Sequence, residues 1–374
     1  MGVGVLLLAA STVLALVIEA LVAAGHWRQN QASVTDHLGQ LERPQYATGC
    51  GDAANWSLFE GGAPAPAAPL AIVRGQAPEP TILVSDEIAA CGAHVRRLRF
   101  FDSSAGEDAR EDESMVSSII QSEMQLLHDG GIVNPRYLRS QWHCLMLAAL
   151  SCDAPMALQR VCVLGHGAGA LSSFLHTVLG CKVTAVDRSA DVALLSRAYF
   201  GSTIHVHVCD AAHFITRQSG GSEAFDAVFV DVDALDCDPL GAPPQLLYSS
   251  EVVLALARVS PIVIINVLGA GDGIDDCLGH SEQNKVQSAF ASNFQTAAWF
   301  ESPLCNNRVL VAGQRFWPPE ATSDELGRAS QRWIQQQPSD LKRTLLGWEM
   351  GSTFFCTSYR KRAQGSYEGP TFSL

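Results

Sequence analysis

The sequence lacks the cysteine and histidine patterns that bind metal ions. It has 11 cysteines in 374 residues, but no C-x-x-C pair and no cluster of His and Cys at the spacing of zinc ligands. Cys162 and Cys209 fall within or beside apolar runs that predict core strands. An odd number of isolated thiols favours a reducing compartment for the folded part. The sequence therefore predicts no metal site.

Charged residues are scarce, and most of them are acidic. Only 17% of the residues are charged, against 47% hydrophobic residues, and the net charge is −13. No basic stripe offsets this charge, which argues against nucleic acid as the main partner. A cationic peptide or an amine suits an acidic protein better. The high apolar content predicts a globular protein with a large core.

A glycine-rich turn between two apolar segments organises the chain. Residues 158–164 lead into Gly165, Gly167 and Gly169, and an apolar pattern with helical spacing follows over residues 171–179. Glycines let the backbone turn sharply and let a ligand lie against N–H groups at the start of the helix. Such turns also occur as plain packing devices. The acidic residues that follow the turn favour the ligand-binding interpretation.

Acidic residues follow three predicted strands after this turn. They are Asp187 after residues 182–186, Asp210 after residues 204–208, and Asp231 with Asp233 after residues 225–230. The carboxyl ends of parallel strands surround one crevice, so we expect the acids to line one site. A nicotinamide cofactor explains only the first acid. S-adenosylmethionine explains three: Asp187 for the ribose, Asp210 near the adenine amine and Asp231 beside the reacting group.

The remaining pattern alternates helices and strands. We expect helices over residues 137–150, 245–259 and 281–293, a buried strand over 261–268, and a final hairpin of strands 296–300 and 308–312 with Cys305–Asn307 in its turn. Asn266, within the buried strand, either bonds to neighbouring backbone or points into the crevice. His143 is typical of a packing histidine. The alternation predicts an α/β fold with a Rossmann-like sheet.

The N-terminal residues 3–24 are almost wholly apolar and long enough to cross a bilayer. They lack the basic start and the cleavage site of a signal peptide. The first basic residue, Arg28, follows the segment, so the positive-inside tendency places the rest of the chain in the cytosol. We therefore expect a single-pass membrane helix. A buried helix or a wrongly chosen start codon is the alternative.

Composition divides the chain into five segments. Residues 1–28 are predicted as a membrane anchor, 29–69 as a linker, 70–135 as a small β-subdomain, 136–318 as the main α/β domain, and 319–374 as a C-terminal helical extension and tail. The β-subdomain rests on short β-rich runs at 70–73, 81–84, 95–101 and 116–121. A Pro- and Ala-rich stretch closes the linker.

Several of these motifs together resemble one family. They are residues 96–100, 120–123, Tyr137-Leu138 with His143 and Met146, the turn at Gly165, and above all residues 225–233 with Pro243-Pro244. They resemble the spermidine-synthase-like branch of the class I methyltransferases, and within it the C-terminal domain of the dual methyltransferases of elongation factor 1-alpha. The likeness runs from Arg96 to Gly313.

The resemblance implies S-adenosylmethionine as cofactor and a protein amine as methyl acceptor, either an N-terminus or a lysine, with a translation elongation factor as first candidate. The residues expected at the cofactor are Gln121, Gly165, Gly167, Gly169, Asp187 and Asp210. Asp231 is expected to orient the amine and receive its proton, with Asn266 as a neutral acceptor, while Gln121 or His143 closes the pocket. We expect the chain to depart from the dual enzymes, with a membrane segment in place of their N-terminal catalytic domain.

Two other functions remain open for this sequence. A polyamine aminopropyltransferase has the same fold and uses a decarboxylated form of the cofactor, although the spacing of Asp231 and Asp233 fits a polyamine groove less well. A catalytically inactive, membrane-tethered scaffold would keep the fold for binding alone. The intact glycine turn and the three acids argue against loss of cofactor binding.

Overall fold

The computed structural model describes eleven stretches of the chain: residues 70–73, 80–88, 93–101, 119–127, 131–150, 158–221, 224–234, 240–268, 276–302, 305–314 and 355–361. The predicted membrane anchor, the linker and the segment 319–354 lie outside them. No helix in the described part is long and apolar enough to cross a membrane.

The N-terminal described residues form a five-stranded antiparallel sheet in the order β1-β2-β3-β4-β5. Its strands are β1 (Ala71–Val73), β2 (Thr81–Ile88), β3 (His94–Phe101), β4 (Ile119–Leu127) and β5 (Ile132–Leu138). The first four lie at the β-rich runs of the predicted β-subdomain, whose expected end at residue 135 falls within β5. The sequence does not predict strand β5. Its last two residues, Tyr137 and Leu138, belong to the sheet and not to the helix expected over residues 137–150, which begins at Gln141.

The larger sheet has eight strands in the order β13-β11-β12-β10-β9-β6-β7-β8. They are β6 (Arg160–Leu164), β7 (Lys182–Asp187), β8 (Val206–Val208), β9 (Ala227–Val230), β10 (Ile262–Leu268), β11 (Thr296–Ser302), β12 (Cys305–Gly313) and β13 (Phe355–Lys361). Strands β6 to β10 are parallel, and β12, next to β10, begins an antiparallel edge. The chain order reverses between β6 and β9, which is where such sheets bind ligands.

Helices cover both faces of the larger sheet. They are α2 (Gln141–Leu150), α3 (Ala170–Thr177), α4 (Ala190–Phe200), α5 (Ala211–Gln218), α6 (Ser250–Val259) after the short η3 (Gln245–Tyr248), and α7 (Asp276–Asn293). Buried residues of α2, α3 and α4 share one core with the small sheet, whereas α5, α6 and α7 pack on the opposite face. Alternate residues of β6 serve the two cores, as a strand covered on both sides requires.

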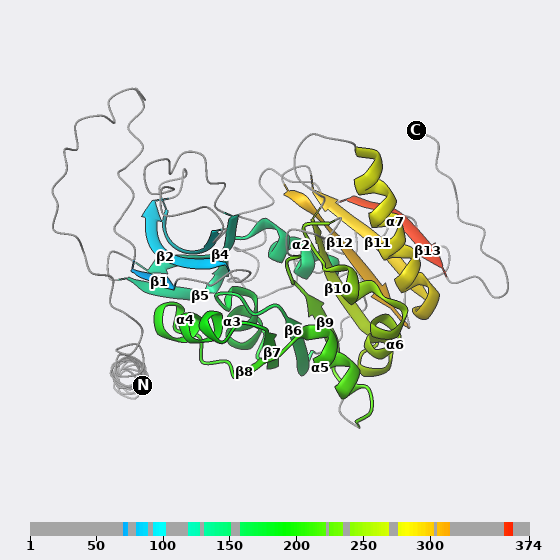
Figure 1. Cartoon of the computed structure of the whole chain (residues 1–374), viewed down its shortest axis with the longest axis horizontal. Coiled ribbons are helices and arrows are strands. Elements are labelled where there is room, and N and C mark those ends of the chain that lie inside the picture. Colours follow the sequence, from blue (N-terminus) through cyan, green and yellow to red (C-terminus); the bar gives the residue numbers. More distant parts are fainter. Residues whose placement is uncertain are drawn as a thin grey trace, which may run out of the picture.

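The two sheets are joined by a shared core and by one buried arginine. Figure 1 shows the small sheet beside α3 and α4, and these helices contact β5 and β2. Arg96 of β3 donates from Nε and Nη2 to the two carboxylate oxygens of Asp86, at 2.6 and 2.7 Å, and from Nη1 to the carbonyl of Tyr199 in α4. The guanidinium thus links the small sheet to the larger domain.

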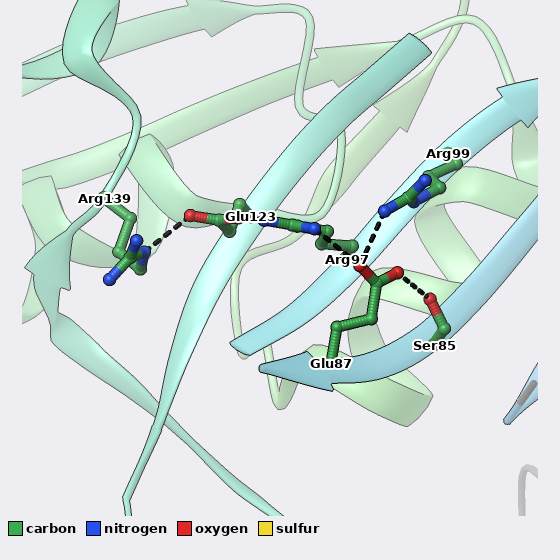
Figure 2. A network of polar contacts seen from close by, with 6 residues as sticks. All are labelled: Ser85, Glu87, Arg97, Arg99, Glu123 and Arg139. Atoms are coloured by element: carbon green, nitrogen blue, oxygen red, sulfur yellow. Dashed lines mark hydrogen bonds and ion pairs between the residues drawn. The ribbon is translucent and has the colours of Figure 1, made fainter. Parts of the chain in front are cut away.

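A second polar network crosses the small sheet from strand to strand. Figure 2 shows Glu87 of β2 between Arg97 and Arg99 of β3, at 2.5 and 2.6 Å. Arg97 also pairs with Glu123 of β4, and Glu123 in turn accepts from Arg139 at 2.5 Å. Arg139 stands just before α2, so the network extends from the sheet to the start of that helix.

The C-terminal part of the larger sheet corrects two expectations. Ser302 pairs with Cys305, so the predicted turn residues Cys305–Asn307 belong to strand β12. The tail that was expected to be irregular contains β13, which pairs antiparallel with β11. The expected helix over residues 245–259 is divided at Ser249 into η3 and α6.

Candidate functional site

The glycine turn follows β6 at the point where the strand order reverses. Gly165 and Gly167 have φ angles of +87° and +53°, in the left-handed region that side chains rarely adopt. A Cβ on Gly165 would stand 1.9 Å from the carbonyl oxygen of Asp231, and one on Gly167 would stand 2.6 Å from Oγ of Ser122. Protein packing alone therefore requires both glycines. Their predicted contact with a cofactor stays a prediction.

Gly169 ends the turn and caps the N-terminus of α3. Its φ is +85°, and a Cβ there would meet Nε2 of His166 at 2.9 Å. The His166 ring lies buried beneath the turn, with Nδ1 3.1 Å from Oγ of Ser172 and Nε2 3.4 Å from Oγ of Ser202. Burial lowers the pKa of His166 to about 4. The imidazole is therefore neutral in the folded protein, and it packs against the turn at Gly169.

Asp187, at the end of β7, accepts hydrogen bonds from the glycine turn. Its Oδ2 accepts from the backbone N–H groups of His166 and Gly167 at 3.1 and 3.0 Å, and its Oδ1 accepts from Ser189 at 3.0 Å. Burial raises the pKa of Asp187, while these N–H groups oppose the change. A carboxylate offers about four acceptor positions, so about one remains for a ligand hydroxyl.

Asp210 follows β8, as predicted, and is exposed. It is the N-cap of α5, with Oδ1 accepting from the backbone N–H of His213 at 2.9 Å. Capping by an Asp side chain is a common structural role and accounts for this hydrogen bond. The second oxygen of the carboxylate is not used in that bond. The expected position near an adenine amine stays a prediction.

Asp231 follows β9 and is held by side chains from two directions. Its Oδ1 accepts from Nδ2 of Asn266 in β10 at 2.8 Å. Its Oδ2 lies 2.7 Å from Nε2 of His143 and 3.4 Å from Nε1 of Trp142, both in α2. The structure thus brings together residues that are 35 and 88 positions apart.

Asn266 is buried and serves as a link within this cluster. While its Nδ2 donates to Asp231, its Oδ1 accepts from Nδ2 of Asn307 in β12 at 2.8 Å. The hydrogen bonds of the Asn266 amide thus go to the side chains of Asp231 and Asn307 and not to neighbouring backbone. Its amide faces the acid as a donor and thus supports Asp231. The predicted role of neutral acceptor stays a prediction.

Asp233 is exposed two residues beyond Asp231. Burial by the surrounding protein raises the pKa of Asp233 to about 8, with further increases from the charges of Asp231 and Asp187. Because the Asp233 side chain is exposed, solvent limits the effect of burial on its pKa.

The small sheet reaches the glycine turn through β4. Leu98 pairs with Ser122 and Arg99 with Ile120, so Gln121 is the additional residue of a β-bulge. The buried Ser122 is the residue in contact with the turn, because its Oγ accepts from the backbone N–H of Ala168 at 3.1 Å. Sequence reasoning selected Gln121 and missed its neighbour. The role of Gln121 at the cofactor stays a prediction.

The chain is similar in sequence to two curated proteins. It is 28% identical over 186 residues to an eEF1A lysine and N-terminal methyltransferase homolog of Drosophila pseudoobscura pseudoobscura, and 26% identical over 186 residues to the homolog of Drosophila melanogaster. Each match covers 46% of this chain and 27% of the relative. The chain thus corresponds to about a quarter of the length of these relatives. No protein-family model matches it.

A solved structure agrees with the fold. The crystal structure of a probable spermidine synthase from Corynebacterium glutamicum ATCC 13032 superposes with a TM-score of 0.50 at 15% identity, over 82% of this chain and 98% of that one. At this identity the match shows the fold alone. The sequence and structure matches confirm the predicted resemblance: the chain has the Rossmann-like fold of the spermidine-synthase-like class I methyltransferases.

Proposed function

We propose that the chain is an S-adenosylmethionine-dependent methyltransferase that acts on a protein amine. The observation that carries the proposal is the setting of Asp231. The residue follows β9 at the switch point of the sheet, beside the glycine turn of β6. Its described partners are Trp142, His143 and Asn266, none of them a Lys or Arg. A carboxylate held in this way is available to an N–H donor from a substrate.

The residues around the turn fit a cofactor that carries a nucleoside. Gly165 and Gly167 are half-buried, so part of their backbone is accessible beside Asp187. Asp187 keeps about one free acceptor position for a ribose hydroxyl, and the exposed Asp210 follows the next strand for the base. When bound there, S-adenosylmethionine would supply a methyl group on a sulfonium; an amine lone pair attacks the methyl carbon while the C–S bond breaks and leaves a thioether.

The chain itself contributes orientation and proton acceptance. A protonated amine has no lone pair, so the enzyme must favour the neutral form and hold it in line with the methyl group. Asp231 orients the amine through its N–H and receives the proton, while Asn266 keeps the carboxylate in place. Asp231 accepts the proton that the amine loses as the new N–C bond forms, and passes it to water.

The proposed acceptor is an N-terminal or lysine amine of a translation elongation factor. The names of the sequence relatives support it, as does the net charge of −13, which favours a basic partner. An α-amine titrates near pH 8 and a lysine near 10.4, so the α-amine needs less help to become neutral. We therefore place the N-terminal amine first.

Calorimetry with the full-length chain tests the cofactor assignment. We expect S-adenosylmethionine to bind more tightly than its decarboxylated analogue, and Asp187→Ala to weaken binding by about tenfold or more through loss of a charge-assisted hydrogen bond. Asp226→Ala is the matched control, because this acid also accepts two backbone N–H groups, from Gln159 and Arg160, at the opposite end of the sheet. Tighter binding of the analogue would instead indicate a polyamine aminopropyltransferase.

We further propose that residues 3–24 anchor the protein in a membrane, with the catalytic domain in the cytosol. The apolar length of the segment and the position of Arg28 after it support this orientation. Protease treatment of intact membranes should degrade the catalytic domain. A shielded domain, or a glycan on Asn55, would mean the opposite orientation.

A further inference from the structure

His143 occupies an unusual position for a histidine. It belongs to α2, where every residue from His143 to Leu150 is buried. The helix packs in the core shared with the small sheet, among apolar side chains. A polar ring in such a helix needs a partner, because an unpaired polar group in an apolar interior is costly. The partner is Asp231, at 2.7 Å from Nε2.

The contact fixes the orientation of the carboxylate. The side chains of His143 and Asp231 are 4% and 15% exposed, so water competes little for this hydrogen bond. His143 holds Oδ2 from the side of α2, and Asn266 holds Oδ1 from the side of β10. With each oxygen held by a different element, the carboxylate cannot rotate freely about its bond to Cβ. Its remaining acceptor positions therefore have a defined direction.

The other ring nitrogen indicates which atom carries the proton. Nδ1 of His143 is buried and has no hydrogen-bond partner within the described residues. A proton on Nδ1 would leave a buried donor unpaired and would leave Nε2 as an acceptor facing a carboxylate, which is repulsive. With the proton on Nε2, the ring donates to Asp231. The geometry thus favours one tautomer.

We propose that His143 is a positioning residue that, through its Nε2–H group, fixes Asp231 for reaction with the substrate amine; its catalytic part rests on the proposed function. His143 does not touch the amine or the cofactor. It acts by holding the carboxylate that does, and Trp142, with Nε1 3.4 Å from the same oxygen, assists from the same helix turn.

Three variants of the full-length chain test the proposal. His143→Phe keeps a ring of similar size and removes the N–H, and we expect kcat for methyl transfer to fall by about tenfold or more, as for loss of one hydrogen bond to a charged group. His143→Gln places an amide N–H near the same point and should recover most of the loss. Cofactor Kd should stay unchanged in both. His176→Phe, which removes a 3.0 Å imidazole hydrogen bond to the carbonyl of Cys181, is the control and should keep full activity.

Nitrogen-15 NMR of the histidine rings gives a second readout that needs no activity, with the His143 signal identified by its absence from His143→Phe. A proton on Nε2 supports the proposal. A proton on Nδ1 with none on Nε2 overturns it, as does wild-type kcat in His143→Phe. Failure of the wild-type chain to bind S-adenosylmethionine would instead remove the proposed function, and the tautomer would still decide whether His143 donates to Asp231.

Discussion

Gly165 joins the two loops that meet at the switch point of the larger sheet. It adopts a left-handed conformation, and the backbone of Asp231 occupies the place where a side chain would begin. The same close approach brings Asp231 next to the turn that is proposed to hold the cofactor. One glycine thus serves both the packing of the sheet and the spacing of the site.

We expect Gly165→Ala to lower the free energy of unfolding by about 2–4 kcal/mol, because the new Cβ must displace backbone in addition to straining φ. Gly180→Ala is the matched control: its φ is +70°, but a Cβ there would meet nothing within 4 Å. In the control, the free energy of unfolding should fall only by the cost of a side chain in the left-handed conformation, about 1–2 kcal/mol. Urea unfolding measures both, and equal losses would contradict the packing account.

His166 should make stability depend on pH. Its folded pKa of about 4 lies below its ordinary value of 6.5, so the unfolded chain binds more protons between these values and stability falls as pH decreases through them. Asp233, with a raised pKa, contributes a trend of opposite sign. The difference in free energy of unfolding between the wild-type chain and His166→Asn isolates the contribution of the histidine to the pH dependence. Relative to that variant, we expect the wild type to lose about 3 kcal/mol from pH 6.5 to 4.

Denaturant unfolding at a series of pH values measures this difference. The control is the pH dependence of His176→Asn, because His176 is exposed. A wild-type chain and a His166→Asn variant with parallel pH profiles would show that His166 is not held neutral in the folded state.

Helix α2 connects the small sheet to the site. It begins at Gln141, directly after the segment in which Arg139 binds Glu123 of β4, and it carries Trp142 and His143 to the carboxylate of Asp231. The small sheet is therefore part of the site in two ways, through the start of α2 and through Ser122 at the glycine turn. Displacement of this sheet should disturb Asp231 without any change in the residues that touch it.

We expect Arg139→Met to lower the free energy of unfolding by about 1–3 kcal/mol, because it leaves the half-buried carboxylate of Glu123 with one partner fewer. Arg136→Met, on the exposed side of β5, is the matched control and should change stability by less than about 0.5 kcal/mol. Thermal or urea unfolding compares them. Similar losses in the two variants would show that the network does not fix the start of α2.

For the whole molecule, the sequence predicted the buried parallel strands well and the small sheet less well. Strands β6 and β10 are covered on both faces, so they are continuous apolar runs that are easy to recognise. Strand β5 contains Asn134 and Pro135, which interrupt such a pattern. Proline is tolerated there because β5 is an edge strand, and edge position is set by the fold and not by local sequence.

The residues of the candidate site also fall into two groups, those that the sequence predicted and those that it did not. The glycines and the acids that follow strands were found from their spacing, because the fold fixes where such residues meet. The partners of Asp231 could not be found in that way. His143 lies 88 residues from it, in an apolar helix where a packing histidine is the ordinary interpretation. Ser122 was missed because a bulge in β4 changes which residue of the motif faces the turn.

The most direct test of the proposed function is transfer of a labelled methyl group to protein. The full-length chain is incubated with labelled S-adenosylmethionine and purified elongation factor 1-alpha, with a cell lysate in parallel, and the label is located by mass spectrometry. We predict label on the N-terminal or a lysine amine of the factor, and its loss in Asp231→Asn, which should still bind the cofactor. Label confined to free polyamines or other small molecules, or no transfer despite bound cofactor, would contradict the account.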